Sequence, residues 1–306
     1  MSNIQITENG AGKYSPEWFY SESQTPEWIS FAHKADELRE NFINLFGIER
    51  LKSLSGKDLL TSLFYNDEGT KTNLCYRLEM DKDIREVFGS ISGGAAYKFG
   101  LFYHKKNQSW TCGSPLKPIH LTEDEAIQKA EEMRNDLVEG AEIISSFGPL
   151  DSEEDYEQLY KQLEHIPGIN MVWRMKYYQM LFPTLFAPFY GQDIQLRVLH
   201  FLNQKPSDIP FIRMGQISLY ARKCNVPGVV FAHIYGKNVG YTNETNDSDI
   251  NTLSDKKHKT HYWMYTVFDD KSWNECQQKG IMVLGMDDIG DYSQFASKEA
   301  LRQELI

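Results

Sequence analysis

The chain has 306 residues with ordinary shares of hydrophobic (41%) and charged (25%) residues, but its formal net charge is −11. This acidic balance argues against a general nucleic-acid binder, because non-specific DNA affinity comes mainly from lysine and arginine, while a local basic patch or a pocket for one extruded base stays possible. No apolar run approaches the ~20 residues of a membrane helix and the N-terminus lacks the features of a signal peptide, so we expect a cytoplasmic protein of about two domains.

Residues 1–24 are polar and predict a mobile arm, in which an aromatic cluster, Trp18 to Tyr20, is a candidate anchor to the body. From Pro26 the pattern becomes helical, and Gly47 stands where the helix should stop. The apolar residues recur at intervals of three or four, at Ile29, Ala32, Ala35, Leu38, Phe42 and Leu45. A second helix is predicted over residues 56–64.

The period then changes to that of strands. Residues 72–80 (TNLCYRLEM) and 95–106 (AAYKFGLFYHKK) both predict a strand, the second with alternating apolar residues after a double glycine. Residues 109–113 (SWTCG) are a candidate partner strand. We therefore expect a small antiparallel sheet among helices.

The segment LTEDEAIQKAEEMRNDLVEG predicts a helix with defined ends. Thr122 and Glu125 form the pattern of a capping box, and Gly140 stands at a C-cap position. The acidic residues 123–125 suit the positive end of the helix dipole, and this explains them more simply than metal binding does.

Downstream, the pattern predicts a mainly helical core. Residues 169–182 are apolar nearly all round, which indicates a buried helix with Trp173, Tyr177, Met180 and Leu181 inside. Further helices are predicted over residues 151–166, 193–203 and 211–224, and a short β-like run over 228–236.

These elements predict an α+β fold: a mainly helical body with a small antiparallel sheet, followed by a partial β/α segment. We divide the chain into an arm (1–24), an α+β domain (25–237), a polar linker (238–260) and a strand–helix–strand segment (261–306).

Motifs for common catalytic and cofactor sites are absent from the sequence. It contains no GxxxxGK[ST] phosphate loop, no GxSxG elbow and no HExxH pair. The run GSISGGAAYKFG precedes a strand-like pattern, which favours a glycine turn over a dinucleotide loop. The cysteines form no CxxC pair, which indicates reduced thiols and no zinc site. We expect no catalytic residue, no metal and no cofactor in this chain.

The segment YWMYTVFDDKSWNECQQKGIMVLGMDDIGDYSQFASKEAL resembles the first third of a PUA-like module of the EVE type. In that family an aromatic strand leads through a Trp-containing helix to a G-I-x-x-(I/L)-G strand and an acidic G-D-x-S turn. The matching residues are Trp263, Trp273, Gly280, Ile281, Leu284, Gly285, Asp287, Gly290, Asp291, Ser293, Phe295, Ser297, Lys298 and Glu299.

The upstream body is similar to the N-terminal regions of McrB-type AAA+ proteins. The similar stretches are YRLE, GSISGGAAYKFGLF, KPIHLTEDEAI and WRMKYYQMLFPTLFAPF. The resemblance implies a non-catalytic recognition or adaptor region of a modification-dependent restriction NTPase in phage defence. Its partners would be modified double-stranded DNA, a nuclease subunit, and other copies joined through an AAA+ domain that a longer parent chain would carry.

The resemblance also implies site residues. EVE-type modules hold a modified base between aromatic rings, and such stacking contributes roughly 1–3 kcal/mol per base. Trp263 and Trp273 are the candidates to line this pocket, with core packing as the alternative for both. Met286 stands where the family often has tryptophan, which weakens stacking there.

Contacts to the DNA backbone are expected from lysine and arginine. The candidates are Lys98, Lys105, Lys106, Arg174 and Lys176, with a partial patch of the three lysines on the sheet. The alternative function is an acidic protein–protein interaction module without DNA contact, and the positions of these cations in the fold discriminate the two.

Overall fold

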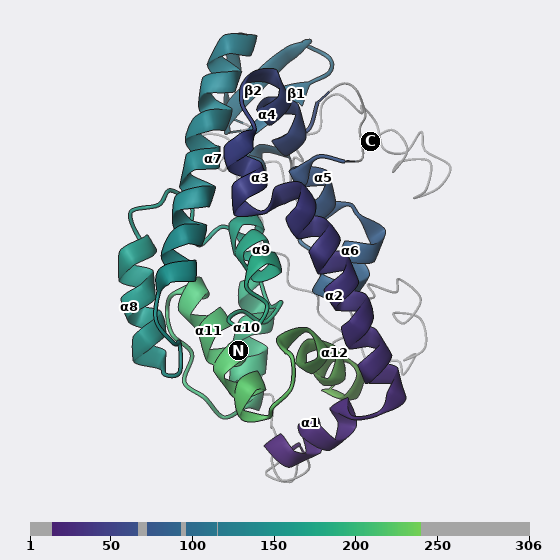
Figure 1. The fold of residues 1–306 in the computed structure, drawn as a ribbon. Coiled ribbons are helices and arrows are strands. Elements are labelled where there is room, and N and C mark those ends of the chain that lie inside the picture. Colours follow the sequence, from purple (N-terminus) through teal and green to yellow (C-terminus); the bar gives the residue numbers. More distant parts are fainter. Residues whose placement is uncertain (1–13, 67–71, 93–95, 115, 240–306) are drawn as a thin grey trace, which may run out of the picture. The chain divides into compact units, whose positions relative to one another are not determined.

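A computed structural model describes residues 14–66, 72–92, 96–114 and 116–239. The chain divides into two units, Met1–Thr245 and Asn246–Ile306, and all of the described residues belong to the first. They form a mainly helical α+β unit with a three-stranded antiparallel sheet, which confirms the predicted fold class for this unit (Figure 1). The predicted PUA-like segment 261–306 lies outside the described residues.

Helices account for most of the described residues. In chain order the elements are α1 (Pro16–Ser23), α2 (Pro26–Phe46), α3 (Ile48–Ser53), α4 (Gly56–Leu63), α5 (Leu74–Glu79), α6 (Lys82–Phe88), the 3₁₀ helix η1 (Ala96–Phe99), β1 (Leu101–His104), β2 (Ser109–Ser114), β3 (Lys117–Leu121), α7 (Glu123–Ser146), α8 (Glu153–Leu163), α9 (Val172–Leu181), α10 (Gln192–Phe201), α11 (Pro210–Lys223) and α12 (Gly228–Val239).

The predicted N-terminal arm is helical over α1. Ser15 caps this helix, its side chain accepting a hydrogen bond from the Trp18 backbone N–H, and a proline occupies its first position. Phe19 is fully buried, with its ring centroid 4.7 Å from that of Phe231 in α12. The expectation of a mobile arm is therefore wrong for α1, whereas the predicted anchoring role of Phe19 is confirmed.

Helix α2 has the predicted ends, and its buried face agrees with the prediction in the middle but not near the ends. It begins at Pro26 and is followed by Gly47 as C-cap. Ile29 and Leu45, which the periodicity assigned to the core, are exposed. The helix packs on α3, α6, α9 and α12, which bury Ala35 and Phe42 as predicted but, towards the two ends, Trp28 in place of Ile29 and Phe46 in place of Leu45. The buried residues of α2 are Trp28, Ala35, Phe42 and Phe46.

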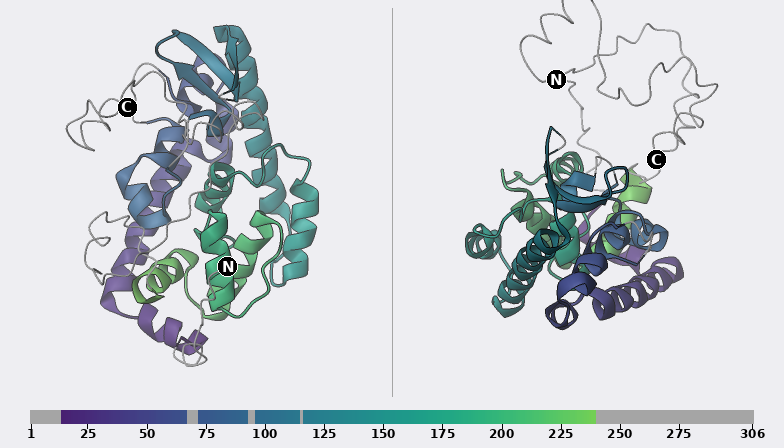
Figure 2. Two further views of the ribbon diagram at one scale, coloured as in Figure 1. Left: turned by 180° about the vertical axis from the view of Figure 1, so that it is seen from behind. Right: turned by 90° about the horizontal axis from the view of Figure 1, so that it is seen from above.

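The sheet has the order β1-β2-β3 and lies against α7 (Figures 1 and 2). Leu101 pairs with Cys112, and Trp110 pairs with Leu121. The predicted strand over 95–106 begins only at Leu101, because residues 96–99 form a 3₁₀ turn. Gly100 follows that turn with φ +81°, a conformation that favours glycine.

Two segments expected to be strands are helices. Residues 74–79 form α5, whose N-cap Asn73 accepts a hydrogen bond from the Tyr76 N–H at 2.8 Å. The β-like run over 228–236 belongs to α12. Periodicity does not separate a short buried strand from a buried helix, since both are apolar on all sides. Tertiary packing decides these segments.

Helix α7 begins as predicted but extends beyond Gly140. The capping box is present: the Glu125 N–H donates to Thr122 Oγ1, and the Thr122 N–H donates to Glu125 Oε2. Gly140 is inside the helix, where a Cβ would lie 2.2 Å from Tyr178 Oη of α9. This glycine permits close helix approach and does not end the helix, so the predicted C-cap is wrong.

Helix α9 lies between α2 and α7, as predicted for the central helix of the core (Figure 1). Trp173, Tyr177 and Met180 are buried, and Leu181 is half-buried. The Tyr177 hydroxyl donates to the Phe46 carbonyl at 2.9 Å, which joins α9 to the end of α2. Among the residues that the structure describes, no helix is long and apolar enough to cross a bilayer.

Candidate functional site

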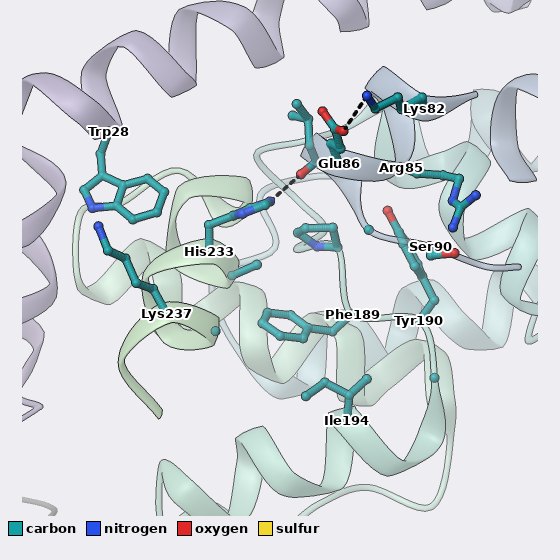
Figure 3. A pocket seen from close by; sticks show the side chains of 16 residues that line it. Trp28, Lys82, Arg85, Glu86, Ser90, Phe189, Tyr190, Ile194, His233 and Lys237 are labelled. Atoms are coloured by element: carbon teal, nitrogen blue, oxygen red, sulfur yellow. Dashed lines mark hydrogen bonds and ion pairs between the residues drawn. The ribbon is translucent and has the colours of Figure 1, made fainter. Parts of the chain in front are cut away.

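A groove of about 750 Å³ lies between the first turn of α2, helix α6, the α9–α10 connection and helix α12 (Figure 3). Trp28 comes from α2, Arg85 from α6, Phe189 and Tyr190 from the connection, and His233 from α12. These segments are far apart in the sequence. The groove is therefore a product of tertiary packing.

The floor of the groove is aromatic and closed to solvent. Trp28, Phe189 and Tyr190 expose only 5%, 3% and 5% of their surface. Phe189 packs edge-on against Phe231 and Tyr235, at ring-centroid distances of 6.4 and 6.2 Å. These rings are consequently part of the core, where Trp28 and Phe189 contact other rings of this chain and the Lys176 ammonium lies 5.8 Å from the centre of the Tyr190 ring.

The rim of the groove carries cations, two of which have acidic partners. Lys82 lies 3.7 Å from Glu86, one helical turn along α6. Lys237 contacts both carboxylate oxygens of Glu27 at 2.9 Å, and its ammonium lies 5.3 Å from the centre of the Trp28 ring. Both pairs are exposed, so each contributes only about 0–1 kcal/mol to stability.

Arg85 differs from the other two cations. Its half-buried side chain donates no hydrogen bond to a described residue, and its Nε is shielded from solvent without an acceptor. Figure 3 shows its guanidinium on the same side of the groove as Ser90 and Tyr190, opposite Trp28 and Lys237. A shielded donor without an acceptor has a cost of about 1–3 kcal/mol.

Side chains from two other elements hold the end of α6 that forms the groove wall. His233 Nε2 donates to the Val87 carbonyl at 2.8 Å, and the Tyr190 hydroxyl lies 2.9 Å from the Phe88 carbonyl oxygen. The last carbonyls of a helix lack partners within the helix, so these donors satisfy them. Burial lowers the pKa of His233, which is therefore neutral at pH 7 and donates from Nε2.

Lys176 supplies a third donor from α9, and it is fully buried. Its ammonium donates to the Gly89 carbonyl at 2.6 Å and to the Leu78 carbonyl at 2.9 Å. Burial, with a smaller effect from the nearby charge of Arg85, lowers the pKa of Lys176 to about 7. Lys176 therefore joins the core helix to the residue that follows α6.

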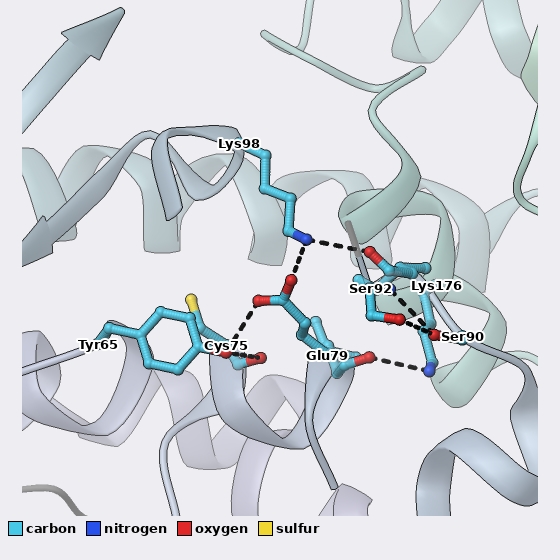
Figure 4. A network of polar contacts seen from close by, with 9 residues as sticks. Tyr65, Cys75, Glu79, Ser90, Ser92, Lys98 and Lys176 are labelled. Atoms are coloured by element: carbon cyan, nitrogen blue, oxygen red, sulfur yellow. Dashed lines mark hydrogen bonds and ion pairs between the residues drawn. The ribbon is translucent and has the colours of Figure 1, made fainter. Parts of the chain in front are cut away.

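Lys98 holds the same segment further along (Figure 4). Its ammonium donates to the Ile91 carbonyl at 3.0 Å and forms an ion pair with Glu79. The Tyr65 hydroxyl donates to the other oxygen of Glu79 at 2.9 Å. Burial, followed by the charge of Glu79, raises the pKa of Tyr65, so the phenol stays protonated and remains the donor. The network is structural, since each charged group has its partner inside the fold.

Three of the five predicted DNA-backbone cations are thus placed inside the fold. Lys176 is buried, Lys98 is paired with Glu79, and Arg174 is buried with its guanidinium 3.3 Å from Asp136. The expectation that these three side chains reach a phosphate at the surface is wrong, because burial and acceptors inside the fold keep their charged groups away from the surface. Lys105 and Lys106 are exposed in the turn between β1 and β2.

The remaining predicted site residues are not placed by the structure. Trp263, Trp273 and Met286 lie outside the described residues. Within the described ranges, no group of three His, Cys, Asp or Glu side chains is positioned to hold a metal ion. Cys75, Cys112 and Cys224 are free thiols.

The groove residues themselves were not predicted from the sequence. Arg85 and Lys237 are charged residues of the kind that is common on helix surfaces, so the sequence does not mark them as special. Trp28 is one of several aromatic residues in α2 and gives no signal of its own. A faint signal is the composition of the segment FAPFYGQ, which is aromatic and turn-forming at once. Nothing local indicates that this segment meets α6 and α12.

Comparisons of the chain with protein-family models, with curated proteins and with solved structures found no match. The resemblance to McrB-type and EVE-type regions therefore stays a prediction, carried by the residues quoted above.

Proposed function

We propose that this chain is a non-catalytic recognition region of an McrB-like defence NTPase, which senses modified DNA or a partner subunit in the cytoplasm. The sequence resemblance supports the class of parent protein. The groove supports a recognition role, because it combines a closed apolar floor with a cation that has no internal acceptor. Nucleotide hydrolysis and DNA cleavage would belong to other parts of the system.

The unpartnered guanidinium of Arg85 is the observation that carries this proposal. An arginine side chain normally finds a carboxylate or carbonyl when it is shielded from water, as Arg213 does in this fold. Arg85 lacks such an acceptor among the described residues while it faces a groove. An anionic group of a ligand would complete it.

The test compares Arg85→Glu with Arg197→Glu, an exposed arginine of α10 that does not line the groove. Both variants change the net charge equally. For DNA sensing, we expect filter binding to prefer a methylated duplex, to weaken with salt, and to weaken in Arg85→Glu with a salt slope reduced by about 1. Affinity that ignores both salt and modification would exclude DNA sensing.

The second candidate is a protein-interaction module without DNA contact, and the placement of the cations favours it. Lys52 pairs with Glu142, and Lys57 lies 3.3 Å from Glu123. Arg134 donates to the Leu51 and Leu54 carbonyls. Together with Lys98, Arg174 and Lys176, these cations are engaged within the chain, which leaves fewer for phosphates. A recognition groove in an acidic protein then suits a protein partner.

A further inference from the structure

We infer that the groove binds a short peptide segment of a partner protein, one that carries apolar side chains next to a carboxylate. This inference rests on the proposed recognition role and names the chemistry of the ligand. It follows from three properties of the groove: its closed rings, its engaged polar groups and the alternating charges of its rim.

The aromatic floor offers no open ring face for a nucleobase. Base recognition in single strands depends on stacking, which needs an exposed face. Trp28 has a T-shaped contact with Phe31 at 5.6 Å, and Phe189 contacts two rings of α12. The floor therefore suits aliphatic or aromatic side chains that enter from above and gain from burial of apolar surface.

Two polar groups of the groove that could read a base edge, on His233 and Tyr190, are already engaged. His233 Nε2 is bonded to the Val87 carbonyl, and the Tyr190 hydroxyl contacts both the Phe88 carbonyl and Gln179. Breaking these bonds would leave buried carbonyls of α6 without partners, at a cost that outweighs one new hydrogen bond. Arg85 is different, since its guanidinium gains a partner without losing one.

The charges of the rim favour a single carboxylate over a phosphate backbone. Glu86 and Glu27 are exposed beside Lys82 and Lys237, so negative and positive groups alternate around the groove. A continuous run of phosphates would meet repulsion from both glutamates. A peptide that places one carboxylate at Arg85 and apolar residues over the floor avoids repulsion from these two glutamates. Electrostatic complementarity of this kind sets orientation and partner choice.

The dimensions of the groove agree with this ligand. Its volume of about 750 Å³ is within the range for sites that enclose several side chains. Ala232 and Gly236 of α12 line the groove one helical turn apart. Because both residues are small, no long side chain of α12 fills the groove at these positions. A larger residue at Ala232 would fill the space without changing any charge.

The experiment selects short random peptides displayed on phage against the wild-type chain, and then measures binding of the selected peptides by fluorescence polarisation. We expect the enriched peptides to place Asp or Glu next to apolar residues. Their affinity should fall by about tenfold or more in Arg85→Glu and in Ala232→Trp, and should stay within about twofold of wild type in Arg197→Glu. Urea unfolding of each variant shows whether the fold is retained, and Arg85→Gln replaces Arg85→Glu if that variant fails to fold.

A labelled oligo-dT strand is measured in parallel, so that two failures can be distinguished. Binding of this strand that depends on Arg85, without peptide enrichment, would overturn the peptide inference while supporting a recognition role for the groove. Peptides that bind equally well to Arg85→Glu and Ala232→Trp, or no ligand of either kind, would overturn both the inference and the proposed use of the groove.

Discussion

Replacing Lys176 with methionine should remove most of the pH dependence of stability between about pH 7 and about pH 8.5. In the folded chain the ammonium is fully buried, and burial lowers its pKa from 10.5 to about 7. Unfolding returns this lysine to its ordinary pKa. Between the two values the unfolded state therefore binds one more proton than the folded state, and the free energy of unfolding rises with pH.

The size of this effect follows from the pKa difference. A full proton difference changes the free energy of unfolding by 1.36 kcal/mol per pH unit. Because Lys176 is half-titrated at the lower limit of the window, the wild-type gain across it is about 1.5 kcal/mol. This pH window lies above the ordinary pKa of a histidine, and burial lowers the pKa of His233 further. The window ends below the ordinary pKa of the Cys75 and Cys224 thiols, and burial raises the pKa of both thiols in the fold. Near the upper limit of the window these two thiols begin to lose protons in the unfolded state alone, which offsets a small part of the gain.

Urea unfolding at the two pH values measures this difference directly. The variant should also be less stable than wild type at the higher pH, because the Leu78 and Gly89 carbonyls lose their donor at about 1–3 kcal/mol each. Lys82→Met is the matched control, since that side chain is 86% exposed and should leave the pH dependence intact. An unchanged pH dependence in Lys176→Met would refute the reasoning.

Two further predictions concern helix packing and capping, and both are checked by urea unfolding. Gly215→Ala should lower the free energy of unfolding by about 1–2 kcal/mol, because the Cβ of the new alanine would lie 2.3 Å from Tyr156 Cδ1. This steric clash outweighs the gain from the higher helix propensity of alanine. Gly148→Ala, with nothing within 4 Å, should change stability by less than about 0.5 kcal/mol, and equal effects at both sites would contradict the clash. Thr122→Ala should cost about 1 kcal/mol through loss of the cap to the Glu125 N–H, whereas Thr122→Ser should retain it; equal losses in the two variants would argue against the cap.

Local signals predicted the elements whose ends depend on a few neighbouring residues. The capping box of α7 needs only Thr122 and Glu125, and the ends of α2 need only Pro26 and Gly47. These features were predicted correctly because their energetics are contained within one turn of helix. The same reasoning failed at Gly140, whose role is set by Tyr178 on another helix.

Segments that are apolar on all sides were predicted poorly. Helix α12 was expected to be a strand, because its valine, phenylalanine and isoleucine residues suit either state. The structure buries Val230, Phe231 and Ile234 against neighbours that come from distant parts of the chain. Its conformation is therefore decided by packing, which no window of local sequence contains.

The candidate site was not predicted for a related reason. The sequence gives the number of cations but does not show which of them bind acceptors inside the fold. Lys98 and Lys176 were expected to contact DNA, yet both donate to carbonyls of the segment that ends α6. Arg85, in helix α6, was overlooked, although its shielded Nε has no acceptor among the described residues. Lys176, which is buried, and Lys98, which is half-buried, thus hold the segment that follows the helix of Arg85.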